Sequence, residues 1–494
     1  MLSSLALLLI AWLYAPALTT TYGFLDDYSN LLLLNASGRD SIALAVSQGR
    51  FSLVVTYPIS MAVHEIGDLV WWRFLGVLAA IGVFFVATWV ISTATRLPRI
   101  SMVVGLAIVS LPAVALFVTW ASVWFFVVGI GLSFLSARAF FEYCLPIQRS
   151  RGARRRVALW IIALVLWVFC IGVYQPVGVI VPVVFAFLLT CRAASLREVI
   201  VNTLRFFVFT LATGVVYLLA YRGGVALVGT AVTSRAAAPE LPAKAQFLVH
   251  EVLPRVLMPM EMALPSSEAA LIVGMFLVLG VVLFRPEIPV RQRVANVLLL
   301  LLALIVSLVP LMVTAENWPS NRIRVASQIW FVLVALVAMI GFGTTIARAT
   351  LHRRLTPHLI TILVVAGSAF VVVHGFVLVR DYMVTPQAAE YEAARAVVRK
   401  FPNGQGPITV EQADWTNSLA PSVQLDEFGL PSSAAPWVPV PFVTLLWQET
   451  HDGPTPPISL VPRSDWRTQT RDHVDFLEIL TRKKLSERPT VDRP

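Results

Sequence analysis

Two adjacent carboxylates, Asp26 and Asp27, follow the first apolar segment of the chain, residues 2–19. This segment is uncharged and long enough to span a bilayer, so the pair is expected at a hydrocarbon boundary, where ionised groups are costly and usually functional. Two neighbouring carboxylates could supply a general base or bind a divalent cation such as Mg²⁺ or Mn²⁺. The alternative is that Asp26 caps a helix beginning at Asp27 or Tyr28. Capping needs only one carboxylate, so we favour the catalytic interpretation.

Two arginines, Arg322 and Arg324, stand in the polar segment 316–324, just before the apolar run 325–347. Guanidinium groups bind phosphate oxygens through two parallel hydrogen bonds, which makes a lipid phosphate the expected ligand. The alternative is that both side chains only extend to the lipid headgroups. We favour phosphate binding, because arginines at this end of the run oppose the charge bias described below.

Tyr174 and Gln175 precede Pro176 at a turn between two apolar segments. A glutamine at the mouth of such a turn could hydrogen-bond a sugar hydroxyl. A tyrosine of the aromatic belt followed by a proline turn explains the same residues equally well. The sequence leaves both interpretations open.

His64 and Glu65, followed by Asp68, resemble a metalloprotease motif in which Asp68 replaces the second histidine. A solvated helix end is the favoured interpretation. A supporting role for His64 and Glu65 in acceptor or metal binding is the alternative.

The composition indicates that these residues belong to a membrane protein. Of the 494 residues, 57% are hydrophobic and 13% are charged, with a mean hydropathy of +0.78, whereas soluble domains carry about a quarter charged residues. We therefore expect a polytopic α-helical membrane protein with about 11 transmembrane helices. The apolar runs cover residues 2–19, 74–92, 101–119, 121–137, 157–173, 176–191, 203–221, 268–284, 295–314, 325–347 and 358–379. The stretch 101–137 is expected to form a tight hairpin centred on Trp120.

The basic residues give these helices an orientation. One set of loops holds 17 Lys or Arg against three acids, and the other set, up to residue 379, holds nine against ten. By the positive-inside rule the first set is cytoplasmic. The N-terminus is then cytoplasmic and the Asp pair faces outward. The net charge of +10 consequently reflects membrane topology and does not point to nucleic acid.

Two further regions are expected on the outer side. The loop 20–73 breaks into short apolar runs typical of amphipathic helices at the membrane interface, and we expect it to be the catalytic loop of a transmembrane domain, 1–379. Residues 380–494 are more polar and predict a small periplasmic α/β or α+β domain. In it we expect a helix starting at Thr385-Pro386, a strand in GPITVEQ, an edge strand or extended apolar strip in PWVPVPFVTLL, a final helix over 472–485 and a disordered end.

Together these motifs resemble the membrane glycosyltransferases of the GT-C fold, which use polyprenyl-phosphate-linked sugars. The chain is most similar to the serotype-converting glucosyltransferase II family, which glucosylates bacterial O-antigen. The resemblance covers the layout of residues 1–380. It is carried by Asp26-Asp27-Tyr28, Gly49-Arg50, Tyr174-Gln175 and the loop with Arg322 and Arg324.

This resemblance implies an inverting transferase in the bacterial cytoplasmic (inner) membrane, which moves a hexose from a polyprenyl-phosphate donor to a surface glycan such as the O-antigen of lipopolysaccharide. Either aspartate would be the base, and a divalent cation at the pair is an open alternative. The expected substrate-binding residues are Arg50, Tyr174, Gln175, Arg322 and Arg324.

Other functions fit the same pattern. Arabinosyl or mannosyl transfer to a protein or cell-wall glycan would look the same in sequence. An O-antigen polymerase, ligase or acyltransferase would more naturally place its key residues in late outer loops. A lipid-linked glycan flippase or transporter would need charged residues inside its helices, where this chain has few.

Overall fold

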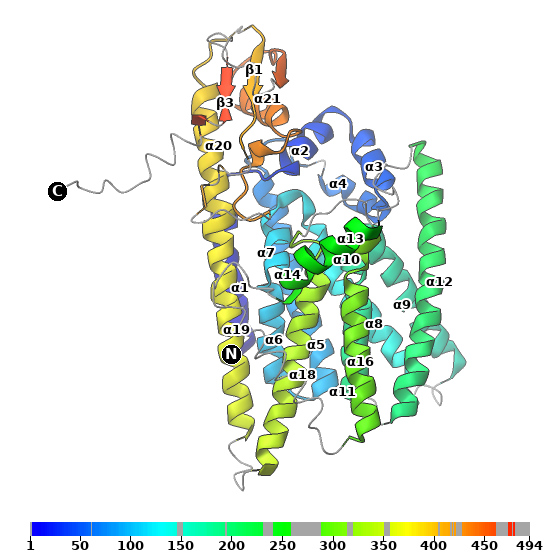
Figure 1. Cartoon of the computed structure of the whole chain (residues 1–494). Helices are drawn as coiled ribbons and strands as arrows, with labels where there is room; N and C mark the ends of the chain where they lie inside the picture. The colour runs from blue at the N-terminus through cyan, green and yellow to red at the C-terminus, as the bar shows by residue number, and fades with distance from the viewer. Residues whose placement is uncertain are drawn as a thin grey trace, which may run out of the picture.

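Long apolar helices dominate the computed structural model, and a smaller group of helices and strands gathers at one end of their bundle (Figure 1). The structure describes residues 2–60, 62–145, 152–192, 195–230, 241–257, 288–313, 320–349, 356–403, 406–414, 417, 419–420, 427–460, 473–476 and 478–479.

Within these residues, seven helices are long and apolar enough to cross a membrane, or eight if a bent pair is one span. The predicted segment 268–284 lies outside the described residues. Each of the other predicted segments overlaps a helix, whereas the total of 11 spans stays a prediction. The bundle helices are α1 (Leu2–Thr19), α5 (Leu69–Thr95), α6 (Pro98–Val109), α7 (Pro112–Thr119), α8 (Phe125–Cys144), α9 (Ala153–Val173), α10 (Gln175–Gly178), α11 (Ile180–Arg192), α12 (Leu196–Val228), α16 (Val290–Ser307), α17 (Val309–Val313), α18 (Val325–Ala349) and α19 (Thr356–Val377).

The bent pair is α6 and α7, whose axes meet at 57°. Pro112 causes the bend, because it lacks an N–H and its ring excludes the carbonyl four residues earlier. The next N–H, of Ala113, donates to the side chain of Gln328 in α18 at 3.0 Å. The break is therefore satisfied by a neighbouring helix.

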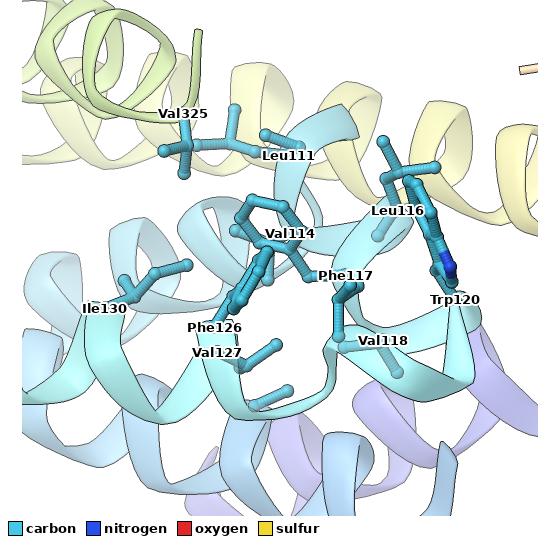
Figure 2. Packing of buried hydrophobic residues seen from close by; sticks show 14 of the residues in the cluster. Leu111, Val114, Leu116, Phe117, Val118, Trp120, Phe126, Val127, Ile130 and Val325 are labelled. Atoms are coloured by element: carbon cyan, nitrogen blue, oxygen red, sulfur yellow. The ribbon is translucent and has the colours of Figure 1, made fainter. Parts of the chain in front are cut away.

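The chain reverses at Trp120, as the predicted hairpin requires. Phe117 of α7 and Phe126 of α8 meet edge to face across the turn, with ring centres 5.3 Å apart. Figure 2 shows these rings packed with Val114 and Val127 in the buried core. All of α7 is buried, which gives the following segment, Trp120–Ser122, a fixed position.

Short helices fill the predicted catalytic loop. They are α2 (Asp26–Ala36), α3 (Gly38–Ser47), η1 (Phe51–Thr56) and α4 (Tyr57–Ser60). Figure 1 places them at the same end of the bundle as the strands. The predicted interfacial helices are thus present, and their depth in a membrane stays a prediction. Three further short helices, α13 (Leu241–Phe247), η5 (Leu248–Val252) and α14 (Leu253–Leu257), follow α12.

The helix predicted from Thr385 is present, but Thr385 does not begin it as an N-cap, because the helix continues from the preceding segment. Helix α19 continues through a π-helical turn, η6 (Leu378–Val384), into α20 (Thr385–Val398), and Val364–Val398 forms one helix. Pro386 cannot donate to the carbonyl of Tyr382, four residues earlier. That carbonyl instead accepts the N–H of Gly429 at 2.8 Å. A tertiary contact therefore lets the helix pass through its proline.

The C-terminal region contains a small parallel sheet of order β2-β1-β3, formed by β1 (Ile408–Glu411), β2 (Ile458–Leu460) and β3 (His473–Asp475). Strand β1 confirms the prediction for GPITVEQ. The predicted strand in PWVPVPFVTLL is wrong, because Pro439 opens the helix α21 (Pro439–Thr450), where its missing N–H costs nothing. Strand β3 begins the stretch predicted as the final helix, 472–485, and the predicted disordered end lies outside the described residues. That this region is a separate periplasmic domain stays a prediction.

Candidate active site

Asp27 is a fully buried carboxylate held by backbone N–H groups. Its Oδ1 accepts from the N–H of Ser122 at 2.7 Å, and its Oδ2 accepts from those of Phe24 at 3.0 Å and Ala121 at 3.3 Å. Burial raises the pKa of Asp27 to about 6, although the N–H of Ser122 and the charge of Arg73 act in the opposite direction. Asp27 therefore fixes residues 20–28, which we call the Asp loop, to the hairpin turn at Trp120–Ser122.

Asp26 has a different environment, because it is only partly buried. Its Oδ1 accepts the indole N–H of Trp437 at 2.8 Å, from the segment preceding α21. The helix α2 starts at Asp26 itself, and its N-cap residue, Leu25, makes no side-chain cap. The capping alternative for Asp26 is therefore wrong. Of the two carboxylates, Asp26 is the one that a substrate can reach.

Leu25 has a left-handed backbone, with φ at 44°, which is costly for a residue with a Cβ. Its N–H donates to the hydroxyl of Ser432 at 2.9 Å. Tyr28, three residues later, stacks on Phe442 of α21 with ring centres 4.0 Å apart. The C-terminal region thus holds the strained turn that presents Asp26.

The donor set around the Asp pair does not fit a divalent cation. Three N–H groups already point at the two oxygens of Asp27, and positive ends of dipoles repel a cation. One oxygen of Asp26 receives the Trp437 N–H. In the described residues, no group of three or more His, Cys, Asp or Glu side chains could hold a metal ion.

Arg73 supplies positive charge beneath the Asp loop. This residue of α5 is fully buried, and its guanidinium lies 3.6 Å from the ring centre of Tyr22. Its Nη1 donates to the carbonyls of Ala17 and Thr20 at 3.2 and 3.1 Å, and its Nη2 donates to that of Tyr22. Arg73 therefore binds the end of α1 to the start of the loop.

Arg322 reaches the opposite side of the hairpin turn. Its guanidinium lies 5.1 Å from the ring centre of Trp120, and its Nε pairs with Glu427 at 3.2 Å. The side chain is 30% exposed. The Trp120 ring also meets that of Phe24 edge to face at 5.1 Å. Arg322 and Phe24 of the Asp loop consequently contact the same indole.

Arg324 points elsewhere, although it was predicted to act with Arg322. It is buried, its Nη1 donates to the carbonyl of Arg255 at 2.7 Å, and its Nη2 donates to Asn321 at 3.0 Å. Asn321 Oδ1 also accepts from Gln328 at 2.9 Å. These contacts give Arg324 a role in holding the loop, and the structure does not bring it to the Asp pair.

Arg50, Tyr174 and Gln175 form a second group. The Arg50 guanidinium lies 5.2 Å from the ring centre of Tyr174 and 5.8 Å from that of Phe126, and these two rings stack at 4.4 Å. Gln175 Nε2 donates to the Gln48 carbonyl at 3.1 Å. Because Phe126 also contacts Phe117, this group joins the same hairpin from its other flank.

His64 and Glu65 lie apart from these groups, at the exposed start of α5. The backbone N–H groups of both donate to Asp68 Oδ2, at 3.2 and 3.3 Å. The His64 ring contacts Asn35 at 3.3 Å. Asp68 thus organises a turn before α5, in line with the favoured interpretation of a solvated helix end.

Several residues at the site were missed by the sequence reasoning. Arg73 could have been found, because an arginine in the apolar run LVWWRFLGV is itself a functional signal. Trp437, Ser432 and Glu427 carry no recognisable motif. The fold alone brings Trp437 and Ser432 to the Asp loop and Glu427 to Arg322. Asp27, Phe24 and Arg322 contact one common segment, Trp120–Ser122.

No family model matches the chain, and no curated protein matches it significantly. Two solved structures are similar. One is the archaeal oligosaccharyltransferase AglB from Archaeoglobus fulgidus in complex with an inhibitory peptide and a dolichol-phosphate, with 11% identity and a TM-score of 0.44 over 88% of this chain and 64% of that one. The other is the oligosaccharyltransferase of the same organism in complex with Zn and sulfate, with 13% identity and a TM-score of 0.45 over 83% of this chain and 60% of that one.

The chain therefore spans less than two thirds of the length of these two proteins. With both TM-scores below 0.5, the likeness by itself assigns neither a family nor an activity.

Proposed function

We propose that this chain is a membrane glycosyltransferase that moves a sugar from a polyprenyl-phosphate donor to an acceptor hydroxyl on the outer side of the membrane. The observation that carries the proposal is the joint use of Trp120–Ser122. Asp27 accepts the N–H groups of Ala121 and Ser122, and Arg322 lies over the ring of Trp120. The carboxylate that adjoins Asp26 and a partly exposed arginine thus border the same three residues.

The residues divide the reaction between them. Asp26 takes the proton from the acceptor hydroxyl as its oxygen bonds to the anomeric carbon of the sugar. The bond from that carbon to the phosphate oxygen breaks, and polyprenyl phosphate leaves with the electron pair. Arg322 stabilises the negative charge that develops on this phosphate. Direct displacement of this kind inverts the anomeric configuration.

Asp27 acts on this reaction by positioning Asp26, since it is buried and its oxygens are occupied by N–H groups. Arg50 and Tyr174 bind substrate on the flank of the hairpin, and Gln175 holds the loop that carries Arg50. None of these proposed steps involves a metal ion. A hexose donor and a surface glycan acceptor such as O-antigen are our first choice, and arabinosyl or mannosyl transfer is the alternative.

The test uses the full-length protein reconstituted in liposomes with radiolabelled polyprenyl-phosphate glucose, mannose and arabinose, each offered with extracted surface glycan. We expect one donor to be used, and Asp26→Asn to reduce transfer by at least a hundredfold, the usual size of a general-base effect. Arg322→Ala should reduce transfer, and Arg322→Lys should recover part of it. Glu392→Gln, at an exposed carboxylate of α20 that is not a candidate site residue, is the matched control.

Full activity of Asp26→Asn would contradict the base assignment. A protein that uses none of the three donors with any extracted glycan, yet moves labelled lipid between leaflets, would instead support a flippase.

A further inference from the structure

A wide apolar groove opens between α1, α6 and α19, at the opposite end of the bundle from the Asp pair. Its cavity measures about 840 Å³, within the range of roughly 300–1,000 Å³ found for small-ligand sites. Each helix contributes apolar side chains to the lining, for example Leu9 of α1, Val103 of α6 and Val364 of α19. Figure 1 shows α1 and α19 along one edge of the bundle with α6 beside them.

One charged side chain, Arg99, lines this groove among residues that are otherwise apolar or hydroxyl-bearing. It is exposed, and it lies in the first turn of α6, which begins at Pro98. The N-terminal turn of a helix adds positive potential to that of the guanidinium. The groove therefore combines an apolar interior with a cationic end.

The length of the groove matches one leaflet. Along α19 it runs from Thr361 to Val373, thirteen residues whose twelve steps of 1.5 Å span about 18 Å. Half of a hydrocarbon core about 30 Å thick is about 15 Å. At the far end, Trp12 stacks on Phe376 with ring centres 3.9 Å apart, and Trp12 also borders a second cavity that includes Arg380. This stacked pair marks the end of the groove.

We infer that the groove between α1, α6 and α19 binds one phospholipid of the Arg99-side leaflet, with its anionic headgroup at Arg99 and an acyl chain extending toward Trp12. The charge at one end, the apolar lining and the length of one leaflet all fit this occupant. The proposed sugar donor does not, because its phosphate must lie near Arg322, and Arg99 is at the other end of the span formed by α6 and α7.

The inference stands apart from the proposed function and is tested without an activity assay. The full-length protein, purified in mild detergent, is incubated with phosphatidylglycerol or phosphatidylcholine, and bound lipid is counted by native mass spectrometry. We expect one phosphatidylglycerol per chain and weaker retention of phosphatidylcholine. Arg99→Ala should weaken retention of phosphatidylglycerol about fivefold, which corresponds to one basic residue near an anionic surface.

Two matched pairs of variants locate the lipid. Ala369→Trp fills the groove and should displace it, whereas Ile362→Trp changes a residue of α19 that is 63% exposed and outside the groove. Arg96→Ala removes a neighbouring arginine that does not line the groove. Each variant must elute and melt like the parent protein.

Equal retention of both lipids, or a loss shared by Arg96→Ala, would show that Arg99 selects no headgroup. Unchanged binding in Ala369→Trp would place the lipid elsewhere. A dimer mass that disappears in Ala369→Trp would assign the groove to a second copy of the chain. Polyprenyl phosphate as the retained lipid would assign it to the donor. Each of these outcomes overturns the inference.

Discussion

Both carboxylate oxygens of Asp27 accept hydrogen bonds from backbone N–H groups, and this separates its role from that of Asp26. Three N–H groups surround its two oxygens, and no part of the residue is exposed. Asp26 accepts one indole N–H and stays partly exposed. Two neighbouring residues of the same type therefore have different environments: Asp27 holds the loop, and Asp26 is the one that we propose faces the substrate.

Stability should depend on pH through Asp27. Burial raises its folded-state pKa to about 6, above an unfolded value near 3.9. Between about pH 4 and pH 6 the folded protein holds a proton that the unfolded chain has lost, so stability falls as the pH rises through this window. Asp27→Asn removes this contribution. The melting temperature of Asp27→Asn relative to the parent protein should therefore increase from pH 4 to pH 6 and level off above it. A constant difference would show that Asp27 does not titrate there.

Trp437 should matter for catalysis more than for stability. The residue is 53% exposed, and its indole N–H donates to Asp26. Trp437→Phe keeps an aromatic ring and removes a hydrogen bond to a charged group, so we expect kcat/KM for transfer to fall roughly tenfold with little change in melting temperature. Trp71→Phe, at a residue 62% exposed on α5, is the control. Equal kinetics for the two variants would remove Trp437 from the site.

At the scale of elements, the loop at residues 47–50 depends on contacts from two helices. Tyr217 and Tyr221 of α12 donate to the carbonyls of Gly49 and Ser47 at 3.2 and 3.0 Å. Gln175 donates to the Gln48 carbonyl on the other side. Contacts from α12 and α10 therefore fix the loop that holds the Arg50 guanidinium over the Tyr174 ring.

Gly49→Ala should disturb this arrangement. Gly49 has a φ of +76°, and a Cβ there would stand 2.5 Å from Tyr217 Oη and 2.9 Å from Gln175 Nε2. We expect a loss of stability of about 1–2 kcal/mol from the backbone alone, with reduced transfer because Arg50 moves. Gly67→Ala, where a Cβ meets nothing within 4 Å, is the control. If both alanine variants have the same melting temperature and the same transfer activity, the contacts described do not hold this loop in place.

The sequence predicted elements well where the signal is local, and poorly where a distant residue decides. Apolar runs located α5 and α9, and the positions of Asp26 and Arg322 beside their helices were evident. The continuation of α19 through Pro386 depends on the N–H of Gly429, and the contact between Asp26 and Trp437 joins residues 411 positions apart. No periodicity contains such information. The sequence of α21 predicts a strand as readily as a helix, because its prolines fit an edge strand and a first helical turn equally well.

At the scale of the whole molecule, the C-terminal region completes the Asp site. Ser432, Trp437 and Phe442 contact Leu25, Asp26 and Tyr28. Glu427 pairs with Arg322 from the same region. The two predicted domains therefore share one hydrophobic core and one site, and neither contains the whole site alone.

The orientation can be checked by labelling single cysteines in intact cells. In a background without Cys144, Cys170 and Cys191, we expect Asp452→Cys to react with a membrane-impermeant maleimide and Arg154→Cys to react only after permeabilisation. Both positions are exposed. The physical reason is the excess of arginine on the Arg154 side, which stays in the cytoplasm. The reverse pattern would put the Asp pair inside and exclude a donor on the outer leaflet.

The hydroxyl of Ser432 that holds the strained Leu25 has a consequence for biosynthesis. The Asp pair leaves the ribosome among the first residues, yet the side chains that fix its geometry are translated about 400 positions later. A nascent chain inserted in the membrane thus contains Asp26 and Asp27 before the side chains that position them have been made. The ability to react would then arise only when translation is nearly finished, so that unfinished copies do not consume the donor that we propose.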